Sequence, residues 1–114
     1  MIELKKDFEV KKYRMRHHQL YKDAELVIYE VTQPFIEGKG HSKWHEVFRY
    51  RVMPPDMYHQ DEFEKYPNDE AFGVWAWSCS NDKVVNKVLK REFPNHPMAK
   101  DGFKCHICYT ASPN

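Results

Sequence analysis

The residues best suited to chemistry lie in two stretches that both resemble β-strands, 43–53 and 72–79. Successive side chains of a strand point to opposite faces, so each stretch divides into two sets. In the first stretch, the face expected to pack in the core carries Trp44, Glu46, Phe48, Tyr50 and Val52. The other face, predicted to be an exposed basic surface of the sheet, carries His45, Val47, Arg49, Arg51 and Met53.

A basic sheet surface beside aromatic side chains is typical of proteins that bind single-stranded nucleic acid. Trp75 and Trp77 in the second stretch would stack on bases, while Arg49 and Arg51, with His45, would contact phosphates. A shift of one residue in strand register changes which side chains share a face. Large aromatic residues also commonly fill a core. The alternative is therefore that both tryptophans are buried under a helix.

The segment Val52–Tyr58, VMPPDMY, suggests a docking site for another protein. Aromatic residues and methionine are enriched at the centres of protein interfaces. Met57 and Tyr58 follow two prolines and lead into an acidic stretch. This combination suits docking on a basic protein partner, and it equally suits an ordinary surface loop.

Two groups of residues could hold a metal ion. Cys105 and Cys108 have the spacing that lets two thiolates bind one zinc ion, and the candidate further ligands are Cys79, His96 and His106. The alternative is two thiols in a final strand, without a cofactor.

The second group is His41, His45 and Glu46, which could bind a metal or supply a general base. In a strand, Glu46 points away from His45, which spoils a shared site. With four glycines and no nucleotide-binding, serine-hydrolase or kinase motif, the sequence predicts no catalytic residue.

Length and composition predict a single globular domain of 114 residues. The net charge is only +1, but residues 1–22 hold seven Lys or Arg and three acidic residues, whereas residues 56–70 hold six acidic residues and one lysine. Three cysteines fit a reducing compartment. No signal peptide or membrane span is recognised in the sequence, so we expect a cytoplasmic protein without membrane contact.

The element expected to organise the chain is Phe72–Phe93, an interior strand over 72–79 followed by a helix over 81–91. Ser80-Asn81-Asp82 supplies helix-capping side chains, and an apolar stripe with helical spacing follows. Residues 24–35 and 43–53 are predicted to pair as an antiparallel hairpin around a turn at 36–40.

The remaining segments have weaker patterns. We predict a basic N-terminal segment (1–23) with a short helix over 12–22, and an acidic loop (54–70) with one helical turn over 62–66. The C-terminal tail (94–114) is expected to hold a last short strand over 103–109.

The sequence thus predicts an α+β fold, with a small antiparallel sheet of three to five strands and one main helix packed on one face. The expected function is a small non-enzymatic module that binds a protein partner, acting as a regulator or inhibitor. The alternatives are a single-stranded nucleic-acid-binding protein and a small metal-dependent enzyme.

Overall fold

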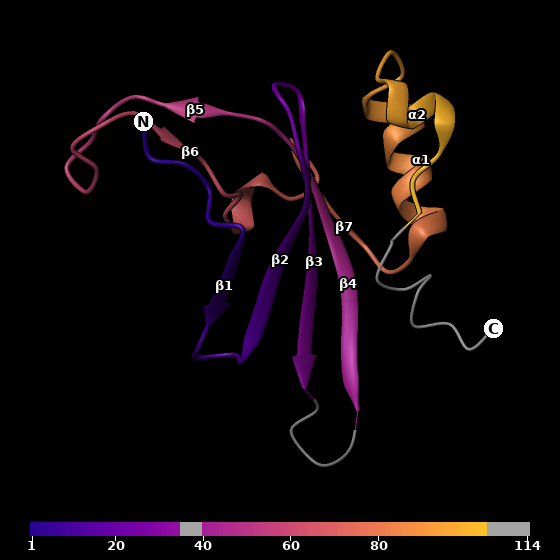
Figure 1. Ribbon diagram of the computed structural model, residues 1–114, viewed down its shortest axis with the longest axis horizontal. Coiled ribbons are helices and arrows are strands. Elements are labelled where there is room, and N and C mark those ends of the chain that lie inside the picture. Colours follow the sequence, from indigo (N-terminus) through magenta and orange to yellow (C-terminus); the bar gives the residue numbers. More distant parts are fainter. Residues whose placement is uncertain (35–39, 105–114) are drawn as a thin grey trace.

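The computed structural model describes residues 1–34 and 40–104, and its main feature is a five-stranded antiparallel sheet (Figure 1). The strand order is β1-β2-β3-β4-β7, so each strand lies beside the next in the chain until β7 joins at β4. The strand bounds are Asp7–Val10 (β1), Met15–Lys22 (β2), Leu26–Pro34 (β3), His41–Arg49 (β4) and Ala76–Cys79 (β7). The predicted α+β class is confirmed.

Strands β3 and β4 form the centre of the sheet. Their register runs from Leu26 opposite Arg49 to Pro34 opposite His41, which confirms the predicted antiparallel hairpin. The first six residues of β3 are buried on both faces, as its β-branched and aromatic composition favours. Most of the predicted turn falls on residues 35–39, outside the described part of the chain.

Helix α1, Asp82–Glu92, packs on one face of this sheet and confirms the predicted helix to within one residue at each end. Asn81 caps it, because its side-chain oxygen accepts a hydrogen bond of 3.0 Å from the backbone N–H of Val84. The helix residues buried against the sheet are Val85, Val88 and Leu89.

Replacing Asn81 with alanine should lower the free energy of unfolding by about 1 kcal/mol, because an N–H of the first turn loses its acceptor. Chemical denaturation would measure this loss. Asn81→Asp is the control, since aspartate also caps helices and should stay close to the wild type. Equal losses in both variants would show that the cap is not what Asn81 contributes.

The sheet separates two apolar clusters. The helix-side cluster joins α1 to the sheet through Leu26, Ile28, Val47, Cys79, Val85, Val88, Leu89, Phe93, Ala99 and Phe103. The opposite cluster contains Val27, Tyr29, Phe48, Ala71 and Ala76, with partly buried neighbours that include Phe8, Tyr66 and Trp75. Both faces of β4 are therefore covered along most of its length, and the prediction that its His45 face is exposed is wrong.

The N-terminal segment is a second hairpin and not the predicted helix. Residues 15–22 form β2, which pairs with β1 on one side and β3 on the other. A register shift between Gln19 and Tyr21 interrupts the alternation, and both Leu20 and Tyr21 pack on the helix-side cluster. Because the bulge interrupts the alternation of a strand, the apolar residues of this segment have a spacing that resembles that of a helix, which explains the wrong prediction.

The strand before α1 is shorter than predicted and lies at the edge of the sheet. It begins at Ala76, because residues 73–75 form a turn in which Gly73 has a φ of +89°. The backbone N–H groups of Val74 and Trp75 both donate to Ala71 O in this turn. The prediction of an interior strand over 72–79 is wrong in length and in position.

Short elements complete the described chain. Between β4 and β7 in the chain, two short strands pair as a ribbon, so the predicted helical turn at 62–66 is wrong. A short helix follows α1, and the sequence predicts no helix there. Their bounds are Val52–Met53 (β5), Phe63–Glu64 (β6), Asp69–Ala71 (a 3-10 turn) and Pro97–Asp101 (α2). The predicted last strand falls mostly on residues 105–114, outside the described residues. Neither of the two described α-helices has the length and apolar character to cross a bilayer.

Candidate functional site

Arg49, predicted to contact phosphate, is bound to the end of α1. Its Nη2 donates to the backbone oxygen of Glu92 at 2.8 Å and to Glu92 Oε1 at 3.2 Å. Its guanidinium lies 4.7 Å from the ring centre of Phe93 and 5.8 Å from that of Trp77. Arg49 therefore ties the sheet to the helix C-terminus by hydrogen bonds and cation–π contacts.

The predicted stacking surface is not assembled. Trp77 packs in the helix-side cluster and Trp75 in the opposite cluster, because the turn before β7 breaks the alternation. Arg51 lies outside β4, with its guanidinium 4.8 Å from the Trp75 ring centre. The two tryptophans thus lie on different faces, each with one arginine beside it, and only Trp77 is under the helix.

His45 is the most unusual predicted residue. It is 2% exposed and meets the edge of Phe103, with ring centres 5.5 Å apart. Neither ring nitrogen has a hydrogen-bond partner in the described structure. Burial lowers the pKa of His45, which outweighs the opposing effect of Asp82 and Glu30. A buried polar group without a partner destabilises a fold and calls for an explanation.

His45 belongs to a row of polar side chains that crosses the whole sheet. The strand registers place Asp7, His18, Glu30, His45 and Cys79 opposite one another in turn. Paired residues of neighbouring strands share a face. This row was not predicted, because residues 12–22 were expected to form a helix and the register of a strand depends on its neighbours.

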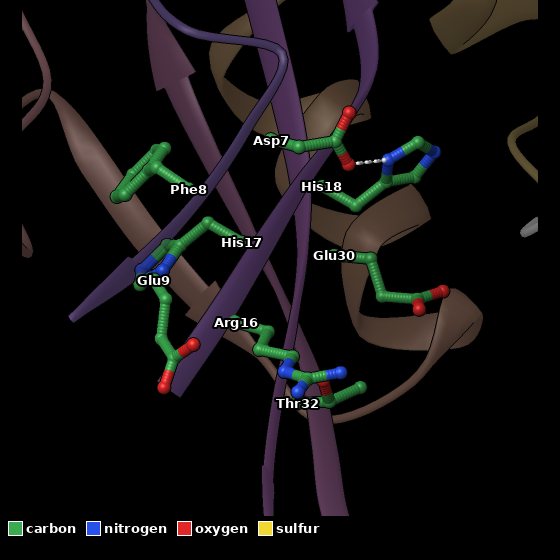
Figure 2. Close-up of a pocket in the computed structure, with 8 residues that line it drawn as sticks. All are labelled: Asp7, Phe8, Glu9, Arg16, His17, His18, Glu30 and Thr32. Carbon is green, nitrogen blue, oxygen red and sulfur yellow. Dashed lines mark hydrogen bonds and ion pairs between the residues drawn. The ribbon is translucent and has the colours of Figure 1, made fainter. Parts of the chain in front are cut away.

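A hollow of about 410 Å³ lies at the β1 end of this row, where Asp7, His18 and Glu30 contribute to its lining (Figure 2). His18 Nδ1 is 2.6 Å from Asp7 Oδ1, and both side chains are exposed. In Figure 2, His18 and Glu30 lie on one side of the strands, and Phe8 and His17 on the other. An aspartate on Nδ1 orients a histidine for proton transfer through Nε2. Thr32 is the one hydroxyl group among the described residues that line the hollow.

A second cluster of polar side chains lies on the opposite face around Glu46, which is partly buried. Its carboxylate accepts hydrogen bonds from the Tyr66 hydroxyl and, at 3.1 Å, from Trp44 Nε1. His17 Nε2 is 4.0 Å from Glu46 Oε1, and the His17 ring stacks on Phe8 at 4.3 Å. Burial lowers the pKa of His17. Glu46 and His45 thus lie on opposite faces of the sheet, as strand alternation predicts. The third residue of this predicted site is His41, whose side chain is outside the described part of the structure.

The predicted metal ligands are not brought together in the described residues. His96 is buried, with Nε2 2.7 Å from Asp23 Oδ2, and its Nδ1 accepts a 3.0 Å hydrogen bond from Met98 N at the start of α2. Both ring nitrogens of His96 are therefore occupied. Burial alone would raise the pKa of Asp23, but hydrogen bonds from Tyr21 and His96 hold it at about 2.

The zinc candidates Cys105, His106 and Cys108 lie outside the described residues. Within residues 1–34 and 40–104, no three His, Cys, Asp or Glu side chains are grouped as metal ligands.

The loop between β5 and β6 presents Met57 and Tyr58. These side chains are 85% and 83% exposed, the highest values among the large apolar residues described. The turn beneath them is ordered by Asp56, whose carboxylate accepts from Tyr58 N and from His59 Nδ1, both at 2.9 Å. His59 in turn stacks on Phe63 at 3.7 Å. Figure 1 shows this loop projecting from the sheet on the side away from the helices.

Comparisons of the chain with protein-family models, with curated proteins and with solved structures find no match.

Proposed function

We propose that this chain is a small non-enzymatic module that binds another protein through the tip of the β5–β6 hairpin. The observation that carries the proposal is the pair Met57 and Tyr58, two large side chains that are more than four-fifths exposed on an ordered turn. Such residues form the energetic centres of interfaces once a partner buries them.

The geometry of this turn favours binding, because the loop is already ordered before a partner docks. Asp56 and His59 are linked by two backbone hydrogen bonds, of 3.0 and 3.3 Å, in addition to their side-chain contact. The hydrogen bond from the His59 ring holds the pKa of Asp56 below its ordinary value. A binding loop that is already ordered loses less conformational entropy when the partner docks.

The charges around the tip indicate the kind of partner. Asp56, Asp61 and Glu62 are exposed on the same loop as Met57 and Tyr58. A complementary surface would be an apolar pocket with basic residues at its rim. The nucleic-acid alternative based on Arg49, Arg51, Trp75 and Trp77 lacks such support, since these residues face in different directions.

The double variant Met57→Ser/Tyr58→Ser should bind the partner more weakly while its fold stays intact. Affinity capture with the wild-type chain would identify the partner, and calorimetry would compare the two forms. We expect the double change to weaken binding at least tenfold, since residues at interface centres contribute about 2 kcal/mol or more.

Val74→Ser is the matched control, because Val74 is 71% exposed but lies in the turn before β7. It should bind the partner as the wild type does. Equal binding by all three forms would reject the hairpin tip as the docking site.

A further inference from the structure

A groove between α1 and α2 is lined by four lysines. Lys83, Lys87, Lys90 and Lys100 surround a hollow of about 520 Å³. The three lysines of α1 follow the spacing i, i+4, i+7, so they share one face of the helix over roughly 10 Å of its axis. All four side chains are exposed.

The fold does not neutralise these charges. Within residues 1–34 and 40–104, none of the four lysines has a carboxylate within ion-pair distance, and Asp101 is the one acidic residue described in the lining. Like charges four residues apart weaken a helix, and Lys83 in the first turn opposes the helix dipole, whereas Lys90 in the last turn suits it. The arrangement costs stability in the isolated chain, and an anionic ligand would offset that cost.

The base of the groove is fixed in place. Asn86 donates to the backbone oxygens of Asp82 and Phe103, and its own side-chain oxygen accepts from Phe103 N at 2.7 Å. Ala99, which also lines the groove, is buried. The lysines therefore project from a junction in which the Asn86 side chain ties α1 to the backbone that follows α2.

The lining suits a phosphate backbone better than a membrane or an apolar peptide. Lysine ammonium groups are point charges that bind phosphate oxygens, and the described lining holds no arginine, whose planar guanidinium would bind carboxylate or phosphate through two parallel hydrogen bonds. An anionic membrane would gain little, because the apolar stripe of α1 is buried against the sheet and cannot insert. The one apolar residue described in the lining, Ala99, offers no pocket for peptide side chains.

We propose that this groove binds the phosphate backbone of a nucleic acid without reading its bases. Among the described residues of the groove there is no aromatic side chain to stack on a base. Duplex and single strand should therefore both bind, with no preference for sequence. The site is separate from the hairpin tip and does not depend on the protein partner proposed above.

Fluorescence anisotropy with a labelled mixed-sequence DNA duplex, measured from low to moderate NaCl, tests this proposal. For four phosphate contacts the logarithm of affinity should fall with the logarithm of salt with a slope of about −3 to −4. The variant with Lys83, Lys87, Lys90 and Lys100 changed to Gln should lose most of this slope. Gln and Lys have similar helix propensities, and the change removes the repulsion between like charges, so the melting temperature of this variant should not fall below that of the wild type.

The matched control changes Lys5, Lys6, Lys11 and Lys12 to Gln, which removes the same charge from exposed positions of the N-terminal segment. This control should keep most of the slope. The proposal is overturned if the control loses as much affinity as the groove variant, or if the groove variant binds like the wild type. Polyglutamate binding as tightly as the duplex would also overturn it, in favour of an acidic protein segment.

Discussion

Replacing Phe48 with alanine is expected to lower the free energy of unfolding by about 3–5 kcal/mol. Phe48 is fully buried in the cluster opposite α1. Its ring centre lies 5.0 Å from that of Tyr66, 6.0 Å from that of Tyr29 and 6.2 Å from that of Trp75. Removing the ring opens a cavity where the loop before β7 meets the sheet. Thermal unfolding should show a fall in melting temperature of more than about 10 °C.

Two further variants make this result specific. Phe48→Leu retains most of the volume and should cost less than the alanine change. Val74→Ala alters an exposed side chain and should stay within about 0.5 kcal/mol of the wild type. A loss for Phe48→Ala no larger than that for Val74→Ala would mean that Phe48 does not hold this cluster together.

Phe48 and α1 represent the part of the fold that local sequence patterns predict well. The helix has a capping residue, Asn81, followed by an apolar stripe, and these two signals agree. Strand β3 is a dense run of β-branched and aromatic residues that ends at Pro34. Where one segment carries several consistent local signals, the sequence alone identified the element.

The errors occur where the regular spacing of a strand is interrupted. In β2, the bulge at Leu20 puts two consecutive side chains on one cluster and imitates a helix. Before β7, the turn at Gly73 sends Trp75 and Trp77 to opposite faces, although their spacing in a continuous strand would put them on one. Neither interruption has a signal strong enough to be recognised from one sequence.

The polar row could not be predicted because it depends on the pairing of five strands. Asp7 and Cys79 lie at its two ends although they are far apart in the chain. Strand order and register come from tertiary packing, and a shift of one residue in any pair would break the row. The lysine groove likewise needs α2, a short helix that the sequence analysis did not predict.

His45 is the one member of the row with a clear energetic cost, and replacing it should stabilise the fold. Its two ring nitrogens are buried without partners in the described structure. His45→Leu removes both polar atoms at similar side-chain volume and should raise the free energy of unfolding at pH 7.5 by about 1–2 kcal/mol. Urea denaturation would measure this change. His45→Asn keeps buried polar atoms and leaves a cavity, so it should be less stable than the wild type.

The same substitution should change how stability depends on pH. Glu30, Cys79, Asp82 and Lys43 surround His45, and burial, the largest effect, puts its pKa below the ordinary value of 6.5. As the pH falls below 6.5, His45 takes up a proton in the unfolded chain but stays neutral in the folded protein. The free energy of unfolding therefore declines, by at most about 1.4 kcal/mol per pH unit, until the pH reaches the pKa of His45 in the folded protein. His45→Leu and His45→Asn should both flatten this decline, and only leucine should also raise stability at pH 7.5. If leucine instead destabilises the fold at pH 7.5 by more than asparagine does, the ring nitrogens of His45 make favourable contacts and the interpretation of an unpaired histidine is wrong.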